Sequence, residues 1–372
     1  NSLWQDAVVT PNGSLFVVGQ TLPSDANAQS IMGVIQSNGS FAWVNSYNTT
    51  GRDGFSRVVR NPSPQSASNP YYVLGYQFDP SGNAQWDDVV LLTVSETGSI
   101  GWKRRIENAS DDEFARNLTA LPNGDLILAG NRGANGVVLR FNNAGVYQNG
   151  ASPEGFSFAF NHVSRRSSGG FYAVGQTFPG GTASLIRFTD ELINEWQSAL
   201  PQLTSASQVF EDPNTGLLYV CGTGVFGGKT RSVIVQLTDT GGSSGPSVNW
   251  TRYLDKSETS YTEGSIRLLS GNRIAFVDGR IPATGGFGLV CAYASVSNLN
   301  LTTCMTKNET VEAVNVNYTF NGPDIFPIVA APTPQASAVA NAAATWQDQD
   351  VCNIPCVAAF NAQPLGINPC GL

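Results

Sequence analysis

Catalytic side chains are scarce in this chain, and its single histidine, His162, restricts the choice most. A Ser-His-Asp triad would have to use His162 as its base. Residues 158–164 combine apolar, strand-forming residues with polar ones, which predicts a strand around the histidine. We therefore expect His162 to be a core or rim residue and not a general base.

Residues 224–230, Gly-Val-Phe-Gly-Gly-Lys-Thr, are similar to a phosphate-binding loop. That loop requires a leading glycine, and Thr223 stands in its place. The segment also joins two predicted strands, whereas a phosphate loop joins a strand to a helix. We expect a hairpin loop here.

Adjacent carboxylates remain, since a pair of them can hydrolyse a glycosidic bond. The candidates are Asp87 with Asp88, Asp111 with Asp112 and Glu113, Asp190 with Glu191, and Asp348 with Asp350. Adjacent acids in a turn are usually solvated, and acids that open repeating units usually cap turns. The opening acids are Asp6, Asp53, Asp112 and Glu263. A ring of such acids could bind structural Ca²⁺, but the Asp-x-Asn-x-Asp spacing is absent. We expect no catalytic residue, cofactor or metal, with calcium as the alternative.

Six cysteines are present, an even number that favours disulfide bonds. They are Cys221, Cys291, Cys304, Cys352, Cys356 and Cys370. No two form a Cys-x-x-Cys pair, and a single histidine leaves a zinc site poorly supplied with ligands. Because disulfide bonds persist in oxidising compartments, we expect a secreted or cell-surface protein.

Nine Asn-x-Ser/Thr sites without a central proline could carry N-linked glycans. They are Asn12, Asn38, Asn48, Asn108, Asn117, Asn249, Asn300, Asn308 and Asn317. Chance supplies part of this number in a chain so rich in Asn, Ser and Thr. The sites nevertheless agree with secretion, and we expect most of them to be glycosylated.

The charge pattern excludes two classes of partner. Charged residues make up 13% of the 372 residues, and the formal net charge is −8. Nucleic acids and anionic membranes both require a basic face. The apolar runs, such as residues 89–92, are far shorter than the roughly 20 residues that cross a bilayer. We expect no nucleic-acid partner and no membrane insertion.

The elements that position these residues repeat along the chain. One signature recurs six times: a small turn, four or five strand-forming residues and a final glycine. Its copies span residues 13–19, 70–75, 124–130, 170–175, 216–222 and 272–279. Successive final glycines are 56, 55, 45, 47 and 57 residues apart. A period near 50 residues indicates a repeat architecture.

Each signature precedes a second strand and then a third that carries a large aromatic residue. The aromatic residues are Trp43, Trp102, Tyr147, Trp196 and Trp250. About twelve residues later an opening strand begins, as at Asp53 and Asp112. Four short strands per unit predict an all-β fold, a single β-propeller of four-stranded antiparallel blades. We expect the aromatic residues to pack between blades, and Asn117 and Asn317 to fall in innermost strands.

The C-terminal third of the chain determines the number of blades. Cys291 and Cys304 fall nearly opposite each other across the hairpin of the sixth unit, where a disulfide is plausible. Residues 317–347 predict a degenerate seventh unit, although Pro327 is unfavourable in a central strand. We favour seven blades, with six blades and a C-terminal extension as the alternative.

The chain therefore divides into a propeller, residues 1–350, and a cysteine-containing tail, residues 351–372. If Cys291 pairs with Cys304, Cys221 remains to bond one tail cysteine. The Pro, Ala and Cys content of the tail suits a strap laid over its own propeller or the next subunit.

The repeat resembles the secreted β-propeller-repeat families. Their units read Asp-Gly-Gly, strand, Gly-x-Thr, then strand, Asn-x-x-Gly and Trp. The best local match runs from Ser168 through Thr177 to Trp196, and the similarity extends over residues 3–350. The resemblance implies the fold and no catalytic residues, since such propellers occur in extracellular proteins, often without an assigned activity.

Three functions agree with these features. We favour a non-catalytic secreted glycoprotein, a structural or assembly subunit of an extracellular matrix, surface coat or filament, such as a flagellar-hair-like or cell-wall fibril. The second is a carbohydrate- or protein-binding propeller that uses exposed aromatics such as Tyr47, Trp86 and Tyr261. The third is a polysaccharide-active enzyme. The expected partners are N-linked glycans, further copies of the chain, other extracellular proteins or polysaccharide.

Overall fold

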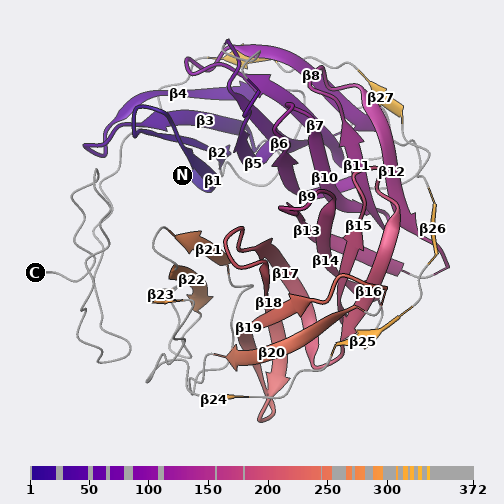
Figure 1. Cartoon of the computed structure of the whole chain (residues 1–372). Helices are drawn as coiled ribbons and strands as arrows, with labels where there is room; N and C mark the ends of the chain where they lie inside the picture. The colour runs from indigo at the N-terminus through magenta and orange to yellow at the C-terminus, as the bar shows by residue number, and fades with distance from the viewer. Residues whose placement is uncertain are drawn as a thin grey trace, which may run out of the picture. The chain divides into compact units, whose positions relative to one another are not determined.

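The computed structural model describes most of residues 2–335, and these form strands and turns without any helix (Figure 1). The described part excludes residues 22–27, 49–52, 64–67, 79–86, 108–112, 156, 179–180, 244, 254–264, 270–272, 281–287, 296–306, 309–312, 317–318, 322–325 and 329–332. No helix in the described part is therefore long and apolar enough to span a bilayer.

Five sheets each contain four strands that pair in chain order. The first two sheets contain β1 (Ser2–Val9), β2 (Leu15–Thr21), β3 (Ser30–Ile35) and β4 (Phe41–Asn48), then β5 (Asp53–Arg60), β6 (Tyr71–Phe78), β7 (Asp87–Val94) and β8 (Ile100–Glu107). The third contains β9 (Glu113–Ala120), β10 (Leu126–Arg132), β11 (Asn135–Phe141) and β12 (Tyr147–Pro153). The fourth and fifth contain β13 (Ser157–Arg165), β14 (Phe171–Phe178), β15 (Ala183–Phe188) and β16 (Asn194–Leu200), then β17 (Leu203–Glu211), β18 (Leu217–Phe226), β19 (Lys229–Asp239) and β20 (Pro246–Tyr253).

A sixth sheet contains three described strands, β21 (Ser265–Leu269), β22 (Arg273–Arg280) and β23 (Gly288–Ser295). Repeated four-stranded antiparallel sheets are consistent with the predicted multi-blade propeller. The chain divides into two compact units. The first comprises residues 1–128, 139–148 and 324–372, and the second comprises residues 129–138 and 149–323.

The predicted signature is confirmed as the second strand of each four-stranded sheet. These strands, β2, β6, β10, β14 and β18, are buried over most of their described length. Phe16, Val73, Leu128, Val174 and Val220, for example, are almost completely buried. The four or five apolar residues of the signature therefore form the core, as their strand propensity predicts.

The final glycine of the signature has a steric cause. The first strand of a sheet bulges opposite this glycine, as at Phe160–His162 in β13 and Ala206–Gln208 in β17. At Gly175 and Gly222, a Cβ atom would overlap a backbone carbonyl oxygen of the bulged strand, that of Ala159 or Ser205. Gly19 and Gly75 are in the same position. Only glycine lets the two backbones approach this closely.

Residues 307–335 overlap the predicted seventh unit, residues 317–347, and differ from it where they are described. Their described parts form five short strands, and each pairs with the last strand of a different sheet. They are β24 (Lys307–Asn308) on β20, β25 (Val314–Asn315) on β16, β26 (Phe320–Asn321) on β12, β27 (Phe326–Ile328) on β8 and β28 (Thr333–Gln335) on β4. Pro327 thus lies in an edge strand, where its missing N–H is tolerated, and not inside a blade. The tail, residues 351–372, lies outside the described residues.

Candidate functional site

Large aromatic side chains join a sheet to a turn of the following sheet, as predicted. In the first unit, Trp43 donates its indole N–H to the carbonyl of Glu96 (3.0 Å), and Trp102 donates to the carbonyl of Asn143 (3.0 Å). The Trp102 ring covers Gly145, whose φ of 71° requires glycine. These indoles act as packing groups between sheets.

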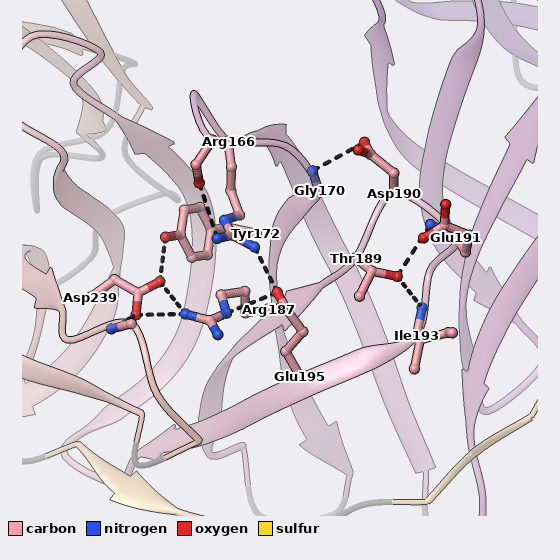
Figure 2. Close-up of polar contacts among 12 residues, drawn as sticks. Arg166, Gly170, Tyr172, Arg187, Thr189, Asp190, Glu191, Ile193, Glu195 and Asp239 are labelled. Carbon is pink, nitrogen blue, oxygen red and sulfur yellow. Dashed lines mark hydrogen bonds and ion pairs between the residues drawn. The ribbon is translucent and has the colours of Figure 1, made fainter.

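The richest charged cluster in the described residues occupies the equivalent place in the second unit (Figure 2). We call it the Arg187 network, and it comprises Arg166, Tyr172, Arg187, Glu195 and Asp239. The guanidinium of Arg187 lies 2.9 Å from both carboxylate oxygens of Asp239 and 3.0 Å from Glu195. The residues come from β14, β15, β16, β19 and the turn before β14, so the network joins two sheets.

Asp239 is held in its ionised form. Burial alone would raise its pKa, but hydrogen bonds from Tyr172 (2.6 Å), Arg187 and the N–H of Gly241 (3.0 Å) together lower it. Burial and the bonded Asp239 carboxylate raise the pKa of Tyr172, so its hydroxyl stays protonated and donates. A carboxylate occupied by this many donors is not available as a base.

Glu195 balances the second arginine of the network. One of its oxygens lies 2.6 Å from Arg166 and 3.0 Å from Arg187. The Arg166 guanidinium also lies over the ring of Tyr172, and that of Arg187 lies over Trp196. Two positive and two negative charges thus neutralise one another, and the arrangement fixes side chains without presenting a reactive group.

His162 has a structural partner that follows from the bulges. Its Nδ1 accepts the backbone N–H of Val209, in the first strand of the next sheet, at 3.5 Å. Asp6 occupies the same place after the bulge of β1, and its Oδ2 accepts the N–H of Val58 at 3.0 Å. Both side chains therefore satisfy a backbone group beside a bulge, and for His162 this agrees with the prediction of a core or rim residue.

Residues 224–230 form the end of the β18–β19 hairpin, as predicted. Phe226 pairs with Lys229, and Gly227 and Gly228 form the two-residue turn with φ values of 60° and 72°. Positive φ at both positions is the geometry of a type I′ hairpin turn. The segment therefore contains no strand-to-helix phosphate loop.

The predicted pairs of adjacent carboxylates lie in different surroundings, one in a turn and another in a strand. Asp190 and Glu191 lie in one turn, where Asp190 accepts the N–H of Gly170 at 3.0 Å. Asp88 is buried, contrary to the solvated position expected for adjacent acids, and lies 2.8 Å from Arg105. Asp87 and Glu113 are placed in strands by their backbones. Asp111, Asp112, Asp348 and Asp350 lie outside the described residues.

The opening acids do not gather around a metal in the described part of the chain. Asp6 bonds to backbone, and the buried Asp53 begins β5. Glu263 and Asp112 lie outside the described residues. Among the described residues, no group of three or more His, Cys, Asp or Glu side chains could hold a metal ion.

The glycosylation sites differ in exposure. Asn12 and Asn38 are exposed in the β1–β2 and β3–β4 turns, and Asn249 is exposed in β20. Asn117, in the first strand of its sheet, is 7% exposed. Asn48 and Asn308 are placed in strands by their backbones, and Asn108, Asn300 and Asn317 lie outside the described residues.

Two further groups of predicted residues are placed only in part. Cys221 is buried in β18 and Cys291 lies in β23, while Cys304, Cys352, Cys356 and Cys370 lie outside the described residues. The pairings predicted for them stay predictions. Tyr47 is only 1% exposed and donates to the carbonyl of Gly98, so it is not the exposed binding residue expected. Trp86 and Tyr261 lie outside the described residues.

The Arg187 network was missed from the sequence, although one signal was available. The third strand of four sheets carries a polar residue just before its last apolar residue. These residues are Thr93, Arg140, Arg187 and Gln236. A polar residue in such an apolar strand predicts a buried partner, but the partner's identity depends on the neighbouring sheet.

A comparison with protein-family models and with curated proteins finds no match. Three solved structures are similar in part. A protein from Lactobacillus plantarum is 9% identical over 83% of this chain and 87% of its own, with a TM-score of 0.48. A protein of unknown function from Bacteroides caccae is 12% identical over 73% and 90%, with a TM-score of 0.44. A functionally unknown protein from Desulfotomaculum acetoxidans is 10% identical over 78% and 89%, with a TM-score of 0.46.

Proposed function

We propose that this protein is a non-catalytic secreted glycoprotein that serves as a building block of an extracellular assembly, such as a matrix, surface coat or filament. The observation that carries the proposal is the Arg187 network. The richest charged cluster in the described part joins two sheets and leaves neither carboxylate without a cation. Such a cluster stabilises a scaffold, and a scaffold acts through its surface.

The composition supports the same proposal. Only 13% of the residues are charged, so charge repulsion between copies is weak despite the net charge of −8. Exposed Asn12 and Asn38 lie in tight turns, where a glycan would project into water. In the turn at Asn38, its Oδ1 accepts a hydrogen bond from the hydroxyl of Ser40 at 2.7 Å, and the asparagine is exposed.

The test is the size of the native glycoprotein. The full chain, secreted from a eukaryotic host, is sedimented over a range of concentrations and imaged by electron microscopy. We expect concentration-dependent oligomers or fibrils, and we expect deletion of residues 351–372 to abolish them. A full-length protein that stays monomeric at every concentration would contradict the assembly role.

The secretory part of the proposal has its own measurement. Treatment with a peptide N-glycosidase should lower the mass by the mass of several glycans. Asn38→Gln should remove one of them, whereas Asn117→Gln should leave the glycan mass unchanged because Asn117 is buried in the fold. An untreated mass equal to that of the bare chain would refute both glycosylation and the secretory assignment.

A further inference from the structure

Three Asn-Gly pairs of this chain lie in turns that are built in the same way. They are Asn12-Gly13, Asn38-Gly39 and Asn123-Gly124, and their glycines have φ values of 81°, 83° and 87°. In each turn the asparagine Oδ1 accepts the backbone N–H two residues later, at 3.1, 3.0 and 3.1 Å respectively. The glycine N–H donates to the carbonyl two residues before the asparagine. The three pairs therefore form a matched set in which the surroundings differ.

An Asn-Gly pair can modify itself without an enzyme. The backbone nitrogen of the glycine can bond to the side-chain carbon Cγ of the asparagine, because glycine has no Cβ atom to hinder the approach. In the tetrahedral intermediate of this reaction, the former Oδ1 carries the negative charge. Groups that donate hydrogen bonds to Oδ1 stabilise that charge, as the donors of an oxyanion hole do. The rate at each turn therefore depends on the donors around Oδ1 and on the freedom of the glycine.

The turn at Asn38 supplies two donors to Oδ1. This oxygen accepts the backbone N–H of Ser40 at 3.0 Å and the Ser40 hydroxyl at 2.7 Å. The same hydroxyl lies 3.0 Å from Oε1 of Gln36, so its shorter contact is the one with Asn38. The two bonds fold the side-chain amide back over the turn and polarise its carbonyl.

The turn at Asn123 supplies one donor. Within the described part of the chain, its Oδ1 accepts only the backbone N–H of Asp125, at 3.1 Å. Residue 125 carries a carboxylate in place of the serine hydroxyl, and this carboxylate lies 2.9 Å from Arg140. Asn123 therefore lacks the second donor that Asn38 has.

The two glycines differ in freedom as well. Gly39 is exposed, and nothing lies within 4 Å of the position of a Cβ atom. Gly124 is buried, and its carbonyl accepts the hydroxyl of Tyr72 at 2.7 Å. The side chains of Ser63 and Asn143 lie 2.9 and 3.1 Å from its Cβ position. Because the glycine N–H must leave its hydrogen bond before it can react, an exposed turn reacts more readily than a clamped one.

From these contacts we infer that Asn38 is a site of spontaneous deamidation in the folded protein, and that Asn123 is protected. The nitrogen of Gly39 bonds to Cγ of Asn38, the bond between Cγ and Nδ2 breaks, and ammonia leaves with the proton of the glycine nitrogen. Water then opens the resulting succinimide at either carbonyl and leaves aspartate or isoaspartate. One amide and one water thus become one carboxylate and one ammonia, without any change of oxidation state.

The modification changes both the turn and the glycosylation site. It adds a negative charge and, as isoaspartate, one methylene group to the backbone of a tight turn. It also removes Nδ2, the atom to which a glycan would be attached, so glycosylation and deamidation exclude each other at Asn38. Deamidation does not depend on the proposed assembly role.

The test uses the full chain, secreted from cells in which N-glycosylation is blocked so that Asn38 is bare. The folded protein is incubated at mildly alkaline pH in water enriched in heavy oxygen, which labels each new carboxylate. Peptide mass spectrometry measures conversion at Asn38 and Asn123 in the same sample. We expect Asn38 to convert about tenfold faster, the factor that corresponds to one additional hydrogen bond in the transition state.

Two variants separate the hydroxyl from the rest of the turn. Ser40→Ala removes the hydroxyl but keeps the Asn-Gly pair and the N–H donor, and it should slow conversion at Asn38 about tenfold. Ser37→Ala is the matched control, since Ser37 is exposed in the same turn and forms no hydrogen bond with Asn38. Its rate should equal that of the wild type. In urea, where the turns are lost, Asn38 and Asn123 should convert at similar rates.

Three results would overturn the inference. Equal conversion at Asn38 and Asn123 in the folded protein would show that the turns do not differ in reactivity. A wild-type rate in Ser40→Ala would remove the hydroxyl from the reaction. If Asn38 stays about tenfold faster in urea, the local sequence and not the folded turn is the cause. The assembly proposal would stand in each case, because sedimentation tests it separately.

Discussion

The contact at Trp102 in the first unit and the Arg187 network in the second occupy the same place in the sheet repeat, but they differ in chemistry. Trp102 covers Gly145 and donates to a backbone carbonyl, and Arg104 adds bonds to the carbonyls of Ala144 (2.9 Å) and Gly145 (3.1 Å). In the second unit, Arg187 contacts the carbonyl of Gly242 and the carboxylate of Asp239. One contact consists of rings and carbonyls, and the other of paired charges.

The difference shows that the repeat determines where neighbouring sheets must be joined but does not determine which type of interaction joins them. At Gly145 the turn accommodates an indole ring and offers Arg104 only backbone carbonyls, so this contact, here called the neutral contact for its acceptors, requires no carboxylate. At Asp239 the turn carries a carboxylate whose side chain is only 10% exposed, and such a charge requires a cation. The neutral contact should therefore tolerate changes of pH and charge that the network cannot.

The largest effect is expected from removing the cation. Arg187→Met leaves Asp239 buried without its partner and should lower the free energy of unfolding by about 3–5 kcal/mol. Denaturant unfolding of the secreted protein measures the change. Arg166→Met is the matched control, because its partner Glu195 is more exposed and should cost about 1 kcal/mol or less. Equal losses in the two variants would show that burial of Asp239 is not decisive.

The neutral contact is broken by adding one methyl group. In Gly145→Ala the new Cβ would lie 2.7 Å from the Trp102 ring at a φ of 71°, so we expect a loss of about 2 kcal/mol. Gly39→Ala separates the two causes, since Gly39 has a φ of 83° in the equivalent turn and nothing within 4 Å of its Cβ position. It should lose only about 1 kcal/mol, the cost of the backbone strain. A similar loss in both variants would mean that the ring contact is unimportant.

Two tyrosines at equivalent positions of β6 and β14 allow a neutral hydrogen-bond acceptor to be compared with a charged one. Tyr172 donates to Asp239, whereas Tyr72 donates to the carbonyl of Gly124 at 2.7 Å. Tyr172→Phe should cost about 2 kcal/mol and Tyr72→Phe about 1 kcal/mol, since hydrogen bonds to charged groups are stronger. Thermal unfolding of both variants measures the difference. A larger loss at Tyr72 would contradict this ranking.

The smallest expected effect is a dependence of the free energy of unfolding on pH in the acid range. Because the folded pKa of Asp239 is lowered, its stabilisation is complete above about pH 4, the unfolded value, and is lost as pH falls through the folded value. We expect the gap in unfolding free energy between wild type and Asp239→Asn to narrow below pH 4. If this difference in unfolding free energy stays constant from neutral pH to pH 2, Asp239 does not contribute to the pH dependence of stability. The difference in unfolding free energy between wild type and Gly145→Ala should not change with pH, because this substitution affects no group that titrates in that range.

The strands and their order could be read from the sequence because local physics determines them. The run of residues 71–74 between small residues is a buried strand in any sheet, and Gly13 and Gly124 require turns with positive φ. The final glycines were recognised as a pattern, although their cause, the bulge of the preceding strand, became visible only in the sheet. The strands at residues 320–335 were misplaced in a seventh unit because two- or three-residue strands carry too weak a local signal.

The sequence by itself determined the all-β class, the period of the sheets, the hairpin at residues 224–230 and the packing role of Trp43 and Trp102. Each of these features depends on neighbouring residues within one repeat or, for the two tryptophans, on a large apolar side chain that must pack against something. Tertiary structure alone decided that Arg187 meets Asp239, that His162 accepts from Val209 and that Tyr47 is buried. Arg187 and Asp239 lie 52 residues apart, and the other two contacts likewise depend on the adjacent sheet. Only the stacking of sheets brings such groups together, because each sheet supplies half of the contact.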